Sequence, residues 1–205
     1  MSLNQTETVE CPKCGKKSPF TVWNSVNVTL DPSVKQDVLS GKIFLFHCPH
    51  CHTETYVLYS LLYHDPDHSF MVWFVPDSGE TEADLPPGMT EMYTGQGYRF
   101  RLASRMPDFV EKILIFEAGL NDIAVEAVKR DVYASVVKSS PDLVFLKFEP
   151  TGEEGPSILF QNLGDRQIVR IPLRSEAVEV LTEVPDELPQ FITVDQDFLR
   201  RNGEN

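Results

Sequence analysis

Two short motifs with the pattern Cys-Pro-x-Cys constrain this sequence more than any other feature. The first is CPKC at residues 11–14, and the second is CPHC at residues 48–51. Two thiols separated by two residues can bind one ion from a tight turn, and two such turns facing each other supply the four thiolates of a tetrahedral zinc site. The chain has four cysteines, and all of them lie in these motifs. We therefore expect one metal ion to be bound by Cys11, Cys14, Cys48 and Cys51.

The residues around the motifs agree with metal-binding turns. Gly15 follows the first motif and permits the left-handed backbone conformation that such turns favour. His52 takes the same place after the second motif, and histidine adopts that conformation more readily than most side chains. The 33 residues between Cys14 and Cys48 exceed what a compact ribbon needs. We expect this insert to contain a strand, a short helix and a strand that returns beside the first, so that strand pairing joins the two turns.

Other chemistries use cysteines in similar patterns. A redox-active Cys-x-x-Cys pair places its nucleophilic thiol at a helix N-terminus, whereas both motifs here lie between segments with strand patterns. A catalytic zinc site keeps one coordination position open, so a cysteine would leave the shell, with His47, His50 or His52 in its place. Iron in a rubredoxin-like site uses the same four thiolates. We expect structural zinc, with iron and an open Cys/His site as alternatives.

The pattern of apolar residues predicts an α+β protein with three regions. Residues 9–76 are predicted to form a β-rich module resembling a zinc ribbon. In that module, Asp31 and Gly41 are the expected start and stop of a short helix. The expected strands of the module are 19–28, 42–48 (a central strand), 53–63 and 69–75, the last two joined by the turn HDPDH. His64 and His68 in this turn could bind a second ion, but a polar hairpin tip is the simpler interpretation.

The remaining residues are predicted to form a linker and a second body. Residues 77–97 have the composition of a linker or long loop. Residues 98–205 are expected to form an α+β body, with an antiparallel αα-hairpin at about 104–137 and a β-meander at about 142–173. A further helix is predicted over 174–184. The carboxylates around the αα-hairpin could serve acid–base chemistry, but we expect structural roles, such as a Glu126–Arg130 ion pair, for Glu111, Glu117, Asp122 and Glu126.

The net charge of −13 constrains the partners. Proteins that bind nucleic acids usually carry a basic field, so we do not expect the whole chain to bind DNA or RNA. Residues 9–76 contain five lysines and six acidic residues, which leaves room for a local contact around Lys13, Lys16 and Lys17. No apolar stretch is long enough to span a bilayer, and we expect no signal peptide and a cytoplasmic location. In that reducing compartment, disulfides are not expected.

Several segments together resemble the CpXC family of bacterial and archaeal proteins, which is named for two Cys-Pro-x-Cys motifs. The resemblance covers roughly Val9 to Val137. It rests on CPKCG, WNSVNVTLDPSVKQDVLSGK, CPHC, LLYHDP and EKILIFEAGLNDIAVEAVKRDVY. It implies metal binding through the four cysteines, and it carries over no catalytic residue.

The sequence lacks the common catalytic motifs. It contains no phosphate-binding loop, no Gly-x-Ser-x-Gly elbow and no His-Glu-x-x-His. We therefore lean towards a cytoplasmic protein without enzymatic activity, in which structural zinc supports a module that binds a protein or a small molecule. A metal-dependent enzyme with an open Cys/His site and a nucleic-acid-binding zinc ribbon are the alternatives.

Overall fold

The computed structural model describes residues 2–85, 88–93, 95–152, 154–174, 177, 179, 181 and 190–202. These residues form a mixed α+β protein, as the sequence predicts, and group into two compact units. Unit 1 comprises Met1–Val110 and Leu188–Ile192, and unit 2 comprises Glu111–Glu187 and Thr193–Asn205.

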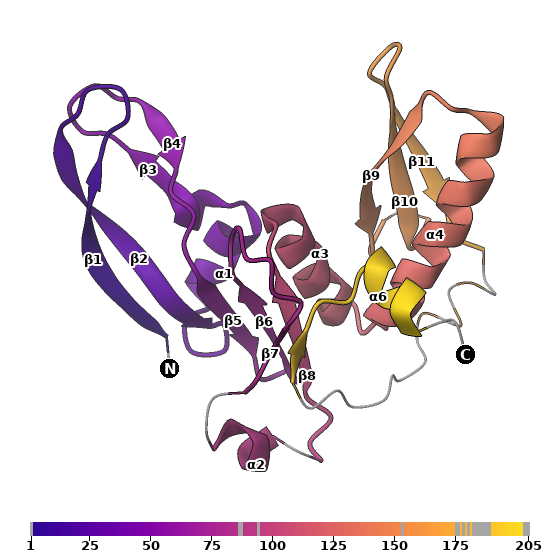
Figure 1. Ribbon diagram of the computed structural model, residues 1–205, viewed down its shortest axis with the longest axis horizontal. Helices are drawn as coiled ribbons and strands as arrows, with labels where there is room; N and C mark the ends of the chain where they lie inside the picture. The colour runs from indigo at the N-terminus through magenta and orange to yellow at the C-terminus, as the bar shows by residue number, and fades with distance from the viewer. Residues whose placement is uncertain are drawn as a thin grey trace. The chain divides into compact units, whose positions relative to one another are not determined.

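Unit 1 is built on a mixed seven-stranded sheet (Figure 1). The strands are β1 (Leu3–Glu10), β2 (Lys17–Asn27), β5 (Leu61–Asp65), β6 (Phe70–Phe74), β7 (Glu82–Ala83), β8 (Arg99–Ala103) and β12 (Phe191–Ile192). Their order is β1-β2-β5-β6-β8-β12-β7. The β1–β2, β5–β6 and β12–β7 pairs are antiparallel, and the β2–β5, β6–β8 and β8–β12 pairs are parallel.

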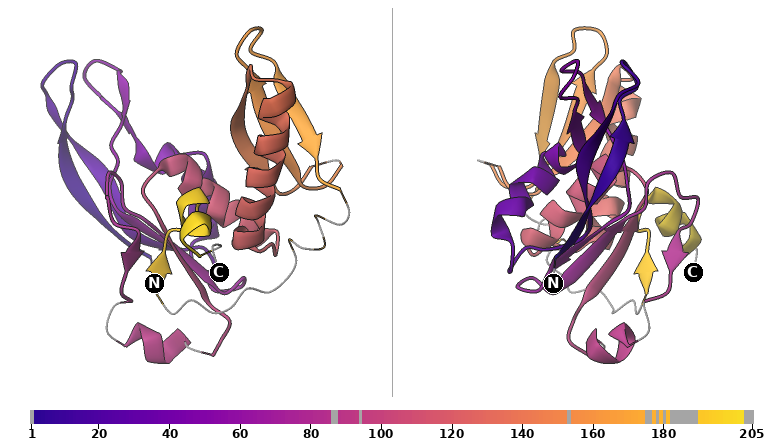
Figure 2. Two further views of the ribbon diagram at one scale, coloured as in Figure 1. Left: turned by 45° about the vertical axis from the view of Figure 1, so that its right-hand side comes forward. Right: turned by 90° about the vertical axis from the view of Figure 1, so that its left-hand side faces the viewer.

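The remaining elements of unit 1 are short. They are α1 (Pro32–Leu39), the 3-10 turn η1 (Lys42–Phe44), a separate hairpin of β3 (Leu45–His47) with β4 (Glu54–Tyr56), and α2 (Met89–Tyr93). Figure 1 shows β1 and β2 extending as a long ribbon with the β3–β4 hairpin beside its far end. The two hairpins stay side by side in both views of Figure 2.

The central strands of unit 1 are apolar on both faces because both faces are covered. On one face, the ring of Phe74 in β6 contacts Phe44 of η1 and Phe109, with centroids 5.4 and 5.3 Å apart. On the other face, Met71 belongs to a second buried cluster that includes Phe100. A central strand with side chains alternating into two cores reads as a continuous apolar run.

The structure corrects the prediction of a central strand over 42–48. Gly41 has a φ of 76°, and the chain after it forms η1 before it enters the short β3. Phe44 is fully buried from this turn, and β3 pairs only with β4 in a two-stranded sheet. The run is therefore apolar because a 3-10 turn and an outer strand both bury side chains, not because a strand crosses the core.

Two other parts of unit 1 differ from the sequence expectations. Strand β1 was not predicted, because its residues are polar and almost all exposed and so carry no burial pattern. Residues 53–63 form two strands, β4 and β5, with irregular chain between them.

The segment expected to be a linker, 77–97, contributes to unit 1. Its described residues include β7 and α2, and Ala83, Met89 and Tyr93 pack against the second buried cluster. Unit 1 also extends to residue 110, so the compact units do not follow the expected limits 9–76 and 98–205. The physical reason is that β8 hydrogen-bonds to β6 and shares its core.

Unit 2 contains a helix packed on a three-stranded meander (Figure 1). The strands β9 (Leu143–Glu149), β10 (Ser157–Asn162) and β11 (Ile168–Pro172) form an antiparallel sheet of order β11-β10-β9, within the range predicted for the meander. Helix α4 (Asp122–Ser139) contacts this sheet, where the ring of Tyr133 stacks on Phe160 with centroids 6.5 Å apart. The last helix is α6 (Gln196–Asn202).

The predicted pair of helices is present as α3 (Met106–Glu117) and α4. Residues 106–110 of α3 belong to unit 1 and its later residues to unit 2. Asn121 caps α4, because its side-chain oxygen accepts hydrogen bonds from the amides of Ile123 (2.9 Å) and Ala124 (3.3 Å).

Most of the helix predicted over 174–184 lies outside the described residues. Its three described members beyond Arg174, namely Ala177, Glu179 and Leu181, are helical. Among the helices in the described part of the chain, none has the length and apolar character required to cross a bilayer.

Candidate metal centre

The first Cys-Pro-x-Cys motif forms the tip of the β1–β2 hairpin. The Cys11 amide donates to the carbonyl of Lys16 (3.0 Å), and the Gly15 amide donates to the carbonyl of Cys11 (2.9 Å). Gly15 has a φ of 68°, the left-handed conformation expected for it. These bonds close the six-residue loop 11–16 that carries both thiols.

The second motif repeats this geometry at the tip of the β3–β4 hairpin. The Cys48 amide donates to the carbonyl of Thr53 (2.9 Å), and the His52 amide donates to the carbonyl of Cys48 (2.9 Å). His52 has a φ of 57°, so the histidine adopts the conformation of the glycine in the first turn, as predicted. The two turns thus have the same backbone hydrogen bonds although their third, fifth and sixth residues differ.

The four sulfur atoms of the two turns converge. Those of Cys11, Cys14, Cys48 and Cys51 all lie within 4.8 Å of one another. The Sγ atoms of Cys11 and Cys51 are 3.6 Å apart, and those of Cys14 and Cys48 are 3.7 Å apart. These separations are far longer than the roughly 2.05 Å of a disulfide bond. A tetrahedron with metal–sulfur bonds of about 2.3 Å has sulfur–sulfur edges of about 3.8 Å.

Side-chain packing holds the two hairpins together beneath the cluster. Phe20 of β2 and Phe46 of β3 meet edge to face, with ring centroids 5.8 Å apart. Phe46 is buried with Cys11 and Cys48, and half-buried Val9 and Val57 complete the group. The expectation that strand pairing joins the two turns was wrong, because β3 pairs with β4 and not with β1 or β2.

The electrostatic environment differs among the four thiols. Cys11 and Cys48 are buried, whereas Cys51 is half-buried and Cys14 is exposed. Hydrogen bonds to the hydroxyl and the backbone amide of Thr53 lower the pKa of Cys51 to about 6. The amide of Lys16 lowers the pKa of Cys14, but desolvation and the neighbouring sulfurs raise it more, to about 11. A bound cation would favour the thiolate at all four positions.

A family model described as "CpXC protein" matches residues 9–129, more than half of the chain. The chain belongs to the CpXC family. The match begins at Val9, two residues before the first cysteine, and ends within α4. The searches found no match among curated proteins or among solved structures. Family membership and the four-cysteine cluster together indicate that this CpXC protein binds a metal such as zinc.

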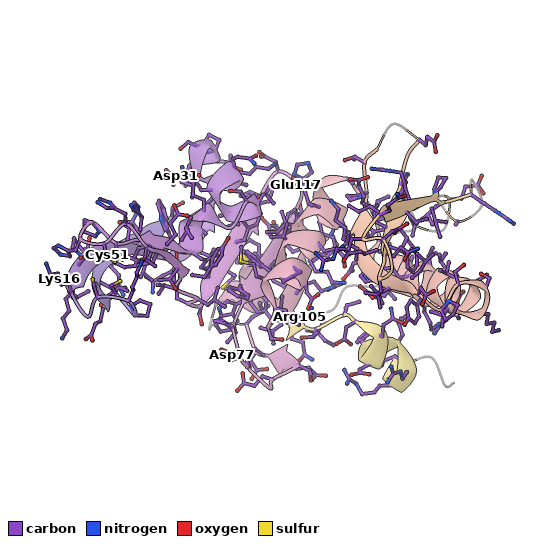
Figure 3. All side chains as sticks on the ribbon, turned by 90° about the horizontal axis from the view of Figure 1, so that it is seen from above. Lys16, Asp31, Cys51, Asp77, Arg105 and Glu117 are labelled. Carbon is purple, nitrogen blue, oxygen red and sulfur yellow. The ribbon has the colours of Figure 1, made fainter. Side chains whose placement is uncertain are left out.

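The histidines and lysines next to the two cysteine motifs are not part of the four-cysteine cluster. His47, His50 and His52 are exposed, and the rings of His47 and His52 meet with centroids 5.7 Å apart. Within the described residues, the only group of candidate metal ligands is the four cysteines. Lys16 and Cys51 lie at the same end of unit 1 (Figure 3). Like Lys13 and Lys17, Lys16 is exposed.

The two histidines of the β5–β6 turn do not come together. Nε2 of His64 lies 3.0 Å from the hydroxyl of Tyr98, whereas Nδ1 of His68 lies 2.8 Å from a carboxylate oxygen of Asp65. Burial lowers the pKa of His64 and raises that of Tyr98 to about 12. Each histidine therefore has its own structural partner, and the interpretation of this segment as a polar hairpin tip fits the geometry better than a second metal site.

Three of the four carboxylates noted in the sequence join a buried network in unit 2. Nζ of Lys112 lies 3.1 Å from Asp122 and 3.4 Å from Glu126. Nζ of Lys129 lies 2.9 Å from Glu126 and 2.7 Å from Glu111. The five charges alternate in sign along this chain of contacts, which satisfies each buried ion with at least one opposite charge.

The sequence interpretation missed both lysines of this network. The proposed partner of Glu126, Arg130, instead contacts Asp131 at 3.2 Å. The available signal was that Lys112 lies among the apolar positions of α3, three residues after Phe109 and four before Phe116. A lysine within an apolar stripe needs a buried counter-charge.

The network shifts the pKa values of its members. Burial raises the pKa of Glu126, but the charges of Lys112 and Lys129 outweigh this effect and hold the pKa below its ordinary value. Burial lowers the pKa of Lys129, but Glu111 and Glu126 outweigh it and raise the pKa. Gln196 of α6 also donates to a carboxylate oxygen of Glu126 (2.8 Å). These groups support one another as ions, which favours the structural role expected for them.

Proposed function

We propose that this CpXC protein is a cytoplasmic protein without enzymatic activity, in which a structural Zn²⁺ ion joins the two hairpins of a zinc-ribbon-like module. The ion would be held by Cys11, Cys14, Cys48 and Cys51. The rest of the molecule would present a surface that binds a protein or a small-molecule partner.

The observation that carries the proposal is the spacing of the sulfur atoms. The sulfur–sulfur distances of 3.6 Å (Cys11–Cys51) and 3.7 Å (Cys14–Cys48) nearly equal the edge of a tetrahedron around zinc, about 3.8 Å. Soft thiolate ligands select zinc or iron over magnesium and calcium. Because four thiolates fill a tetrahedral shell, such a site has no open position for a substrate, which supports a structural role over a catalytic one.

The core at the hairpin tips is small, so a bound ion would add stability that the core lacks. Only Cys11, Phe46 and Cys48 are buried in the cluster beneath the sulfurs. A core of this size contributes little stability by itself, and small domains of this kind commonly depend on a structural metal.

Metal analysis of protein purified without added zinc tests the proposal. We expect about one zinc ion per chain, negligible iron, and loss of the ion together with the fold of the hairpin tips in a strong chelator. Protein that carries no metal, or whose structure is unchanged in chelator, would contradict the structural role. One iron per chain would change the identity of the ion and leave the four ligands as proposed.

A further inference from the structure

Strand β12 reaches unit 1 from a distant part of the sequence. Leu188–Ile192 belongs to unit 1, whereas the residues on both sides of this stretch, up to Glu187 and from Thr193, belong to unit 2. The stretch also lies beyond residue 129, where the match to the CpXC family ends. A strand position in the unit that carries the family motifs is thus filled by a segment from outside the family match.

The position filled by β12 is a slot between β8 and β7. Ile192 pairs with Arg101 of β8 in parallel, and Phe191 and Ile192 pair with Ala83 and Glu82 of β7 in antiparallel orientation. The side chain of Gln190 donates to the carboxylate of Glu82 (3.2 Å). The backbone of β12 therefore has a hydrogen-bonded neighbour on each side.

The side chain of Phe191 is buried among aromatic and apolar side chains of the slot. Phe191 is 1% exposed, and its ring lies edge to face against Trp73 and Phe100, with both centroids 5.4 Å away. Met71 and Leu102 belong to the same buried cluster. Offset and edge-to-face contacts of this kind add specificity to the burial of an aromatic ring.

These features match the way in which a sheet binds an extended peptide. In strand addition, main-chain hydrogen bonds hold the peptide and pockets for particular side chains select its sequence. Strand β12 is only two residues long and has one aromatic anchor. Because this segment is tethered to the same chain, it has a high effective concentration at the slot.

We propose that the slot between β7 and β8 is a binding site for an extended segment of a partner protein that carries an aromatic residue followed by a β-branched residue. Strand β12 occupies the site in cis and competes with the partner. The inference rests on the binding role proposed above and names its surface, but it does not depend on the metal.

The test uses the full-length chain and a synthetic peptide with the sequence of residues 187–195. The chain has two tryptophans, Trp23 and Trp73, so Trp23→Phe leaves Trp73 as a reporter beside the slot. In the Trp23→Phe protein, we expect a change of Trp73 fluorescence only at high peptide concentration, because β12 competes. Adding Phe191→Ala removes the anchor in cis, and we expect the peptide to bind at least tenfold more tightly.

The control is the same peptide with alanine in place of its phenylalanine, which should not bind either protein. Equal peptide binding with and without Phe191→Ala, or no binding to a folded Phe191→Ala protein, would overturn the inference. If Phe191→Ala does not fold, the Trp23→Phe protein is titrated to millimolar peptide, and the absence of a saturable, phenylalanine-dependent response overturns it. These variants keep the four cysteines. A protein that contains one zinc ion per chain but does not bind the peptide would therefore contradict the inference about the slot and leave the metal proposal unaffected.

Discussion

Each of the two cysteine turns needs one residue with a positive φ angle, and the chain meets this need in two ways. Gly15 adopts it without a side chain, whereas His52 adopts it with one. The left-handed conformation costs an ordinary side chain roughly 1–2 kcal/mol. The second turn therefore holds a small strain that the first does not.

Exchanging residues at these two positions should reveal that strain. We expect Gly15→Ala to lower the free energy of unfolding of the metal-loaded protein by about 1 kcal/mol. A Cβ at Gly15 would meet no atom within 4 Å, so the cost is conformational alone. His52→Gly should be neutral or slightly stabilising. Denaturant titration of both variants measures the change in the free energy of unfolding. A Gly15→Ala protein as stable as the unchanged protein would contradict the backbone geometry assigned to residue 15.

Substitution of a single buried ligand should release the ion. In Cys48→Ser, we expect loss of stoichiometric metal, because three thiolates and a hydroxyl bind zinc far more weakly than four thiolates. His50→Ser is the matched control, since His50 lies in the same turn, is exposed and is outside the cluster. Elemental analysis of both proteins decides the matter. Equal metal loss in the control would show that the turn itself, rather than its sulfur atoms, holds the metal.

At the scale of elements, ion pairs between buried charged side chains connect α3 and α4. Lys112, Asp122 and Glu126 are each less than 10% exposed. A buried ion pair adds little net stability compared with apolar residues, but removal of one partner leaves an uncompensated charge.

Lys112→Met should therefore be strongly destabilising. We expect a loss of roughly 3–5 kcal/mol in the free energy of unfolding, because the carboxylates of Asp122 and Glu126 lose a shared cation. Arg130→Met on the exposed side of α4 is the control and should change stability by less than about 0.5 kcal/mol. Similar losses in the two variants, measured by chemical denaturation, would show that the network carries no special weight.

The pKa shifts of this network predict how stability depends on pH. The pKa of Glu126 is lowered in the folded protein, so its contribution is present above the pKa of the unfolded chain and is lost as the pH falls through the folded value. The pKa of Lys129 is raised, so its contribution is lost only as the pH rises through that higher value. We expect stability to fall on the acid side below about pH 4. In Glu126→Gln this acid-side slope should be shallower, and an unchanged slope would contradict the assignment.

At the scale of the whole molecule, the four-cysteine cluster and the charge network belong to different compact units. Removal of an ion held by the four cysteines would break contacts only among residues of unit 1. The two features should therefore fail separately when each is perturbed.

Hydrogen exchange with and without a chelator measures this separation. We expect faster exchange at the tips of the β1–β2 and β3–β4 hairpins after metal removal, and unchanged protection in α4 and β10. Lys112→Met should give the reverse pattern. Loss of protection across the entire chain on chelation would mean that the ion stabilises the molecule as one cooperative unit.

Features encoded within a few residues could be predicted from the sequence. These features depend on atoms that are close along the chain. They are the spacing of the cysteines, the glycine after the first pair and the histidine after the second, the cap at Asn121 and the alternation in the β-meander. The four-cysteine cluster could be inferred although its halves are 33 residues apart, because a metal ion requires that its ligands converge. Strand β1 could not be predicted, because the polar, exposed side chains of an outer strand show no alternation of apolar and polar residues.

By itself, then, the sequence determined that the four cysteines would cluster, the α+β class and the positions of the main helices. Only the tertiary structure decided that an edge-to-face contact between Phe20 and Phe46 joins the two hairpins. It also decided that Lys112 pairs with Asp122 and Glu126, and that Phe191 fills the slot beside β8. The physical reason is range. Turns, caps and ligand spacing depend on atoms close along the chain, whereas these partners lie far apart in the sequence and are selected only when the elements pack.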